Sequence, residues 1–231
     1  MQYLFFDLEK ATSKKGGRIC EFGYVIVDEN FKIIEENNLI INPNISDDDW
    51  DNYVVENLLH KTIEEYKSNP KFNHYYQKIS NLILSADYVF GHSLHGDVNA
   101  INTECKRYSR PSINFTFYEI KEFYNKIKKP VSDVSVSNML IALNIAGETL
   151  EHDAKNDAYN TMLILKSLLA EAQNSVQGLI KQCPNAKLEN KNFNIKTQPL
   201  NFITNDQLHA SASIGQLLGD KLAGLLPDEE D

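Results

Sequence analysis

Two carboxylates stand two residues apart at the end of an apolar run near the start of the sequence. The run covers residues 3–6, and Asp7 and Glu9 follow it in the stretch YLFFDLEK. An unbroken apolar run is typical of a buried strand, and side chains two apart on a strand point to the same face. Asp7 and Glu9 are therefore expected side by side, where their charges repel unless a cation lies between them.

Three more residues stand at unusual junctions. Asp97 follows the apolar stretch VFG at the start of a predicted helix, and His152 and Asp157 lie at the mouth of the last long one. Five residues along a helix rotate a side chain by about 140°. His152 and Asp157 therefore converge only if His152 lies on the preceding loop and Asp157 in the first turns, with Asp153 as the N-cap.

Four carboxylates without nearby cationic partners are typical of a metal site, and hard oxygen ligands suit Mg²⁺ or Mn²⁺. Two such ions roughly 4 Å apart activate water and stabilise the leaving oxygen of an in-line displacement at phosphorus. A histidine beside them is suited to accept the proton of the water, because its pKa lies near neutrality. Each motif has a simpler explanation alone: strand-end surface charges, a first-turn acid favoured by the helix dipole, or a helix cap. Their joint occurrence favours the metal site.

The elements that would position these residues follow from apolar periodicity. Strands are predicted at residues 3–6, 19–28 and 31–43, joined by short links as an antiparallel meander, and at 87–93. Helices are predicted at 71–86, 96–108, 135–145 and 153–172, and in parts of 44–70. Strands followed by alternating helices and strands indicate one mixed α/β domain over residues 1–175.

The remaining residues, 176–231, are predicted to form a C-terminal extension. Residues 178–206 lack a sustained period and are rich in Asn and Lys, which is typical of a linker. Apolar residues recur at helical spacing between 209 and 231, so a short helix is expected there. That helix would either pack on the domain or dock onto a partner.

Composition narrows the class of protein. Of 231 residues, 42% are hydrophobic and 10% aromatic, enough for a packed core. We find neither a secretory signal nor an apolar run long enough to span a membrane. Three widely spaced cysteines argue against a disulfide or zinc framework. We therefore expect a cytoplasmic protein with no membrane association.

The net charge of −9 does not by itself indicate a nucleic-acid binder, although an empty cation site contributes negative charge. The stretch 106–129 carries seven Lys or Arg against two Glu, with interleaved aromatic residues. It suits either a backbone-tracking groove with stacking faces or a solvated helix face above core aromatics, and the second alternative is the more common.

The motifs FFDLEK, ICEFGYVIV, VFGHSLHGDV, SVSNMLIALNI and HDAKNDAYNT occur in this order between residue 3 and about residue 172. In their order and spacing they resemble the DEDDh branch of the DnaQ-like 3′–5′ exonucleases. The resemblance implies an RNase H-like fold, an α/β architecture in which a five-stranded mixed sheet is flanked by helices. It covers roughly three quarters of the chain.

The resemblance also implies roles for single residues. Asp7, Glu9 and Asp157 would ligate the catalytic metal ion, Asp7 would bridge to a second ion held by Asp97, and His152 would be the general base. The cofactors would be two divalent cations, Mg²⁺ or Mn²⁺. Candidate substrate contacts are five residues beside the motifs: Leu8, Lys10, His92, Ser93 and His95. The simpler alternatives are a structural role for His92 and a solvent-exposed position without function for His95. The chain departs from the family pattern at Ser93, where Asn is usual, and at Gly96, where an aromatic residue is usual.

The residues and the resemblance together predict a metal-dependent exonuclease, and the resemblance implies that it acts in the 3′–5′ direction and releases nucleoside 5′-monophosphates. The expected substrates are the 3′ ends of single-stranded or frayed DNA or RNA. One alternative is a polymerase proofreading subunit docked through the C-terminal extension. Another is a nucleic-acid-binding module without turnover. A homodimer or a protein partner would be held through residues 178–231.

Overall fold

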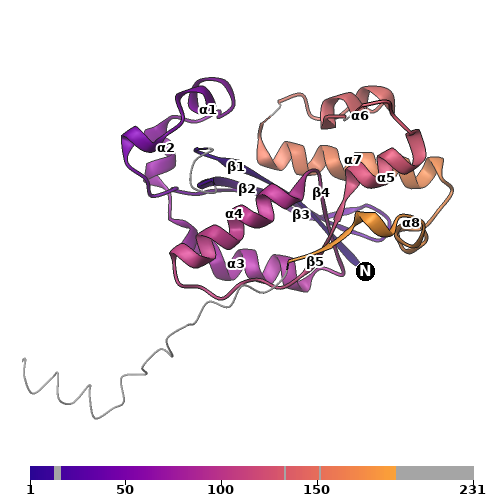
Figure 1. The fold of residues 1–231 in the computed structure, drawn as a ribbon, viewed down its shortest axis with the longest axis horizontal. Helices are drawn as coiled ribbons and strands as arrows, with labels where there is room; N and C mark the ends of the chain where they lie inside the picture. Colours follow the sequence, from indigo (N-terminus) through magenta and orange to yellow (C-terminus); the bar gives the residue numbers. More distant parts are fainter. Residues whose placement is uncertain (13–16, 133, 151, 191–231) are drawn as a thin grey trace, which may run out of the picture. The chain divides into compact units, whose positions relative to one another are not determined.

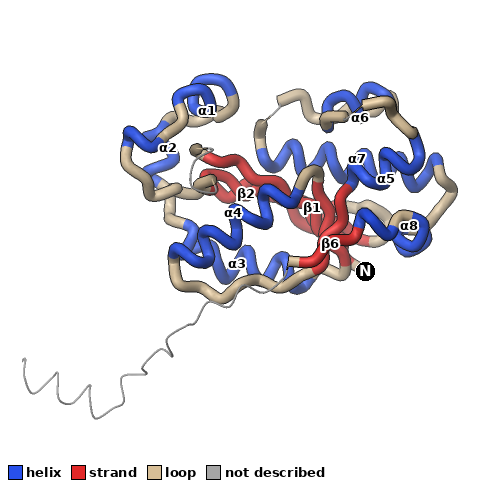
Figure 2. Tube along the Cα trace, viewed as in Figure 1, coloured by secondary structure: helices blue, strands red, loops and turns tan. Residues whose placement is uncertain are grey.

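The computed structural model describes residues 1–12, 17–132, 134–150 and 152–190. Its centre is a six-stranded sheet in the order β3-β2-β1-β4-β5-β6 (Figure 2). The strands are β1 (Gln2–Lys10), β2 (Ile19–Asp28), β3 (Ile33–Ile40), β4 (Tyr88–Gly91), β5 (Thr116–Glu119) and β6 (Lys187–Glu189). The sheet thus has one strand more than the five expected, and β6 is the strand that the prediction lacked.

The predicted antiparallel meander is confirmed: β1 pairs with β2, and β2 with β3, both antiparallel. On its other side β1 pairs in parallel with β4, and β4 with β5. The sheet is therefore mixed, as expected for an RNase H-like fold. Because β1 and β4 are parallel neighbours, their carboxyl ends reach the same edge of the sheet.

Helices cover both faces of the sheet (Figure 1). The helices are α1 (Asn52–Asn57), α2 (Ile63–Ser68), α3 (Phe72–Ser85), α4 (Leu94–Arg107), α5 (Ile120–Lys128), α6 (Val136–Ala142), α7 (Ala154–Glu171) and α8 (Val176–Gln182), with short 3₁₀ turns η2 (Asp47–Asp49) and η3 (Pro184–Ala186). One apolar core holds Leu4 and Phe6 of β1 with α3 and α4. The other holds Tyr3 and Phe5 with α5, α6, α7 and α8. Alternate residues of β1 thus face opposite layers, as strand geometry requires.

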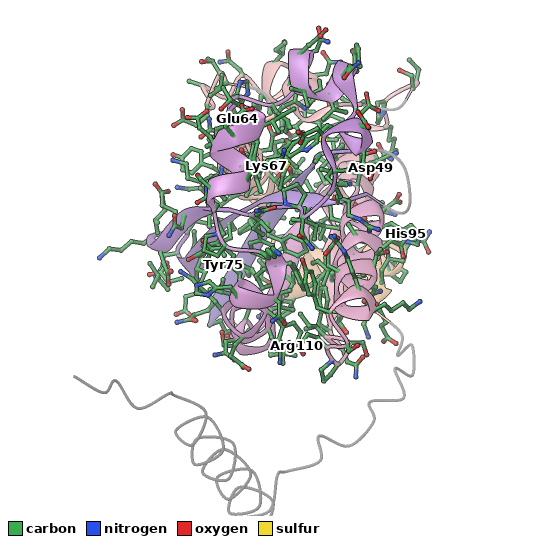
Figure 3. The ribbon with its side chains drawn as sticks, turned by 90° about the vertical axis from the view of Figure 1, so that its left-hand side faces the viewer. Asp49, Glu64, Lys67, Tyr75, His95 and Arg110 are labelled. Carbon is green, nitrogen blue, oxygen red and sulfur yellow. The ribbon has the colours of Figure 1, made fainter. Side chains whose placement is uncertain are left out.

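A third, smaller apolar cluster lies where residues 44–70 fold back on the ends of β1 and β2. It contains Cys20, Trp50 and Tyr66. Helix α2, which carries Glu64 and Lys67, lies at the outside of this region (Figure 3). Beneath it the buried Glu21 accepts hydrogen bonds from Tyr66 Oη at 2.6 Å and from Lys61 Nζ at 3.1 Å. A buried charge is tolerated when such partners satisfy it.

The basic stretch 106–129 does not form a groove beside the predicted active site. It contains β5 and α5, neither of which was predicted, and its residues Phe117, Tyr118, Phe123 and Tyr124 are buried in the two cores. The structure therefore agrees with the second alternative, in which these aromatics belong to the core.

Part of the predicted C-terminal extension packs against the domain. Helix α8 contributes Val176 and Leu179 to the α7 core, and β6 pairs antiparallel with β5. Asn190 then donates hydrogen bonds to the backbone carbonyls of Phe115 (2.9 Å) and Ile113 (2.6 Å). Within the described residues, α8, η3 and β6 therefore belong to the same compact unit as the rest of the sheet. The rest of the extension, including the predicted short helix at 209–231, lies outside the described residues.

Two further observations concern the class of protein to which the chain was expected to belong. Within the described part of the chain, no helix is both long and apolar enough to cross a membrane. The three cysteines, Cys20, Cys105 and Cys183, are buried free thiols, in agreement with the prediction of no disulfide framework.

Candidate active site

Asp7 and Glu9 lie on the face of β1 that also carries Tyr3 and Phe5. This face is covered by α7, so the two carboxylates point toward the layer that supplies Asp157. Glu9 is buried, with 9% of its surface exposed, and Asp7 is partly buried. The strand therefore ends by placing two acids beneath a helix, as the alternation of residues predicted.

Asp97 reaches the same edge of the sheet from α4. Strand β4 ends at Gly91, the chain turns through Ser93 in the left-handed region (φ 57°), and α4 begins at Leu94. A Cβ at Gly91 would lie 2.5 Å from the Leu94 side chain, so the absence of a side chain at Gly91 leaves room for Leu94 to pack against the end of β4. The turn starts the helix two residues earlier than predicted and places Asp97, only 5% exposed, in its first turn.

His152 and Asp157 meet as their spacing predicted. His152 lies before α7 with φ of 59°, and Asp153 caps the helix by accepting a hydrogen bond from the Asn156 backbone N–H at 3.0 Å. The backbone N–H of His152 donates to Asp157 Oδ2 at 3.2 Å. The loop position of the histidine and the first-turn position of the aspartate bring the two residues together.

Gly23 of β2 lets the start of α7 approach the sheet. It is the register partner of Asp7 on β1. A Cβ built on Gly23 would lie 2.0 Å from the backbone of Ala154 and Lys155. Ala154 and Ala158 are fully buried on the sheet-facing side of the helix. Small residues on both elements therefore set the distance between Asp157 and the β1 carboxylates.

Helix α7 also holds the loop that carries His152. The buried Asn160 accepts a hydrogen bond from the backbone N–H of Glu148 at 2.8 Å and donates one to its carbonyl at 3.0 Å. One turn earlier, Asn156 donates to the Leu150 carbonyl at 3.4 Å. These contacts fix the loop backbone against the helix, so the position of His152 depends on asparagines that the sequence reading did not single out.

All five predicted catalytic residues line one open cleft of about 660 Å³: Asp7, Glu9, Asp97, His152 and Asp157. Ligand atoms of Glu9, His152 and Asp157 lie within 4.8 Å of one another, a spacing that one metal ion can bridge. The donors are carboxylate oxygens and an imidazole nitrogen, which suit a divalent ion such as Mg²⁺ or Mn²⁺. The residues present therefore fit the divalent cation that the motifs imply.

The carboxylates of the cleft lie close enough to repel one another and to raise one another's pKa values. Burial and the carboxylates of Asp97, Glu9 and Asp157 raise the pKa of Asp7 well above its usual value. Burial, with Asp157 and Glu21 nearby, raises the pKa of Glu9 to about 9. Burial also raises the pKa of Asp97 to about 6, and the Lys10 ammonium limits this rise. Clustered acids with perturbed pKa values are characteristic of functional sites, and a bound cation would relieve their repulsion.

Four of the five predicted substrate contacts line the same cleft: Leu8, Lys10, His92 and Ser93. The ring of His92 lies 3.3 Å from the carbonyl oxygen of Val134, which joins the end of β4 to the loop before α6. His95 is exposed on the outer side of α4 and does not line the cleft (Figure 3). Its backbone N–H donates to Glu119 Oε1 at 3.2 Å. The structure therefore agrees with a solvated His95.

One wall of the cleft was missed by the sequence analysis. It comes from the start of α6 and consists of Ser135, Val136, Ser137 and Asn138. The segment SVSNMLIALNI was predicted as an amphipathic helix and counted among the motifs of the resemblance, but none of its residues was predicted to line the site. A run of small polar residues just before that apolar pattern was the available signal, but such a run is equally typical of an N-cap, and Ser135 does accept a hydrogen bond from the Asn138 backbone N–H at 3.3 Å.

Comparison with known proteins places this arrangement in a family. The model of the RNase_T family, described as exonuclease, matches residues 4–165. No curated protein matches the sequence. Among solved structures, the nuclease domain of 3′hExo, a DEDDh family member bound to rAMP, is 14% identical, with 83% of this chain and 97% of that chain covered and a TM-score of 0.64.

Two other solved structures share the fold. Exonuclease X in complex with 5′ overhanging duplex DNA is 12% identical over 78% of this chain and 97% of that chain, with a TM-score of 0.58. A 3′-exonuclease recognising a histone mRNA stem-loop is 15% identical over 84% and 87%, with a TM-score of 0.63. The family match covers more than half of the sequence, and the five predicted catalytic residues lie in one cleft on the shared fold. The chain therefore belongs to the RNase_T exonuclease family, and it shares the fold of these solved nucleases.

Proposed function

We propose that the cleft binds two divalent metal ions, Mg²⁺ or Mn²⁺, and hydrolyses the last phosphodiester bond at the 3′ end of a single-stranded or frayed nucleic acid. The products would be a nucleoside 5′-monophosphate and a strand shortened by one nucleotide. The observation that carries this proposal is the convergence of five ionisable residues, from β1, α4 and the start of α7, in one cleft.

Each carboxylate has a role set by its place. The ligand atoms of Glu9, Asp157 and His152 lie within 4.8 Å of one another, and Glu9 and Asp157 would hold one ion. The charges of both Asp97 and Asp157 raise the pKa of Asp7, so Asp7 is near both residues. It would therefore contact both ions. Bound divalent ions would supply a nucleophilic water and neutralise charge on the reacting phosphate.

His152 is suited to accept the proton of the attacking water. It is exposed to the cleft, and its backbone is tied to Asp157 and, through the loop, to Asn160. These contacts hold the backbone of His152, and one of its ring nitrogens lies within 4.8 Å of carboxylate oxygens of Glu9 and Asp157. A neutral imidazole near neutral pH can take a proton and return it to water after the bond has broken.

The lining of the cleft supports a single strand as the substrate. Ser135, Ser137 and Asn138 offer hydrogen-bonding groups in the same cleft as the carboxylates, and Val136 offers apolar surface. Groups of both kinds would contact the sugar–phosphate backbone and a base of an unpaired end. Relatives of this fold have been seen with histone mRNA and with DNA, so both RNA and DNA are candidate substrates.

The proposal is tested by a gel time course on 5′-labelled single-stranded DNA and RNA of the same sequence, with Mg²⁺, Mn²⁺ or EDTA. We expect a ladder that shortens from the 3′ end and that EDTA abolishes. Asp157→Asn should abolish the ladder and His152→Ala should slow it steeply. Glu171→Gln is the matched control, because it removes an exposed carboxylate from the far end of the same helix, where it pairs with Lys128.

Near-normal turnover by Asp157→Asn would contradict the mechanism, and unchanged kinetics in His152→Ala would remove the histidine from its role. Intact strands that nevertheless bind the wild-type protein in Mg²⁺ would favour a binding module without turnover. Activity that appears only after a polymerase is added would favour a proofreading subunit. A homodimer or partner contact through residues 178–231 stays a prediction, and most of that segment lies outside the described residues.

A further inference from the structure

A lysine amino group lies among the carboxylates of the cleft. Lys10 directly follows the Asp7–Glu9 pair at the end of β1, and its Nζ lies 2.8 Å from Asp97 Oδ1. The Asp97 side chain is 7% exposed, and that of Lys10 is 32% exposed. This ion pair therefore sits at the boundary between the buried carboxylates and the solvent of the cleft.

The path of the Lys10 side chain is bounded by two glycines. A Cβ built on Gly17 (φ 77°) would lie 2.9 Å from Lys10 Cδ, and one built on Gly96 would lie 3.6 Å from Lys10 Nζ. The stem of the lysine therefore passes against the Gly17 backbone, and its amino group lies beside the first turn of α4. Side chains at these two positions would narrow this path.

The position of the ammonium has an electrostatic consequence for Asp97. A divalent ion held by Asp97 would have to lie within a few ångströms of Lys10 Nζ, and like charges at that separation repel strongly when partly buried. The Lys10 ammonium and a divalent ion would therefore compete for the same Asp97 carboxylate.

We propose that Lys10 is a tethered cation at the second ion position. Its ammonium neutralises Asp97 while the cleft holds no nucleic acid, and leaves Asp97 for a phosphate oxygen of the substrate when the second divalent ion binds. The enzyme would then carry one ion at rest and acquire the second together with its substrate. This inference rests on the proposed function, since it deepens the two-ion scheme of the same cleft.

Lys10 would consequently be a substrate-contacting residue whose partner changes during the cycle. A free ammonium at the end of four methylene groups can move between two anions a few ångströms apart, whereas a backbone donor cannot. The phosphate that arrives with the substrate offers the new anion, so the release of Asp97 leaves no unpaired positive charge in the cleft.

The test is a Mn²⁺ titration of the full-length protein without nucleic acid, in which electron paramagnetic resonance counts the free ion. Wild-type protein should show one tight site and one weak one. Lys10→Met, which keeps the chain length but removes the charge, should bind the second ion at least tenfold more tightly. Lys10→Arg should resemble wild type because it keeps the charge. Lys128→Met is the matched control, since it removes an exposed lysine that pairs with Glu171 outside the cleft.

Addition of thymidine 5′-monophosphate should tighten the second site in wild type and have a smaller effect in Lys10→Met. The inference is overturned if Lys10→Met and wild type bind the second ion equally, or if Lys128→Met gains affinity to the same extent. Failure of the proposed function is separate: wild-type protein that does not hydrolyse nucleic acid refutes the exonuclease mechanism, whereas a tenfold gain in Lys10→Met still supports the competition at Asp97.

Discussion

Gly23→Ala offers a sharp test of how the cleft is positioned. The new methyl group would lie 2.0 Å from backbone atoms of Ala154 and Lys155, whereas ordinary contact begins at 3.4 Å. The start of α7 or the strand beneath it must therefore retreat by about 1.4 Å, the difference between these two distances. The obstacle is backbone rather than the end of a side chain, so no rotamer change relieves it.

This displacement should affect activity more than stability. Asp157 lies in the first turn of α7, and the register partner of Gly23 is Asp7, so the two carboxylates would separate. A misplacement of about 1 Å can lower a rate by about 100-fold. Overpacking of this kind costs about 1–3 kcal/mol of unfolding free energy. For a domain of this size each kcal/mol lowers Tm by about 2–4 °C.

The assay compares kcat on a single-stranded oligonucleotide with Tm for the same preparations. Gly178→Ala is the matched control, because the same methyl group would there meet the amide group of the Asn174 side chain, which can rotate, and α8 does not line the cleft. We expect kcat to fall about 100-fold in Gly23→Ala, with the fold retained, and to stay near wild type in Gly178→Ala. A Gly23→Ala enzyme with wild-type kcat would show that the approach of α7 to β2 does not set the site.

Three further predictions follow from the same contacts. Asn160→Ala removes both hydrogen bonds to Glu148, so it should lower the unfolding free energy by about 1–3 kcal/mol. It should also reduce kcat more than it changes KM. Steady-state kinetics in which only KM changes would contradict this prediction. The folded-state pKa of Glu9 is raised from 4.5 to about 9, so the metal-free fold keeps a proton that the unfolded chain releases over this range. Its unfolding free energy should therefore fall as pH rises through this range, by up to ~1.4 kcal/mol per pH unit, and saturating Mg²⁺ should flatten the dependence; a flat profile in urea titrations with EDTA would refute it. Tyr66→Phe leaves the buried Glu21 with one donor fewer and should destabilise the protein by about 1–3 kcal/mol without changing kcat in Mg²⁺, as measured by urea unfolding and a turnover assay.

The sequence predicted the elements that carry strong local signals. β2 was placed at its observed bounds because residues 19–28 form a long apolar run. The relation between His152 and Asp157 followed from helix geometry and a cap residue, both of which are local. The meander was readable because each strand lies next to its partner in the sequence.

Elements defined by distant partners were not readable. β5 and β6 span only four and three residues, too few for a period to show, and β6 is a strand only because β5 lies beside it. The same holds for the cleft wall at Ser137 and Asn138, which faces the carboxylates only after α6 has packed on α7. The role of Gly23 is likewise set by the backbone of a helix more than a hundred residues away in the sequence.

The carboxylates of the cleft come from segments that lie 150 residues apart in the sequence, from Asp7 to Asp157. Closing a loop of this length is entropically unfavourable, and contacts of high sequence separation tend to form late in folding. A nascent chain that ends before residue 152 would hold Asp7, Glu9 and Asp97 but lack His152 and Asp157. The growing chain would therefore have no nuclease activity until α7 has been synthesised. Cellular nucleic acids would not be cleaved before this helix has docked on the sheet.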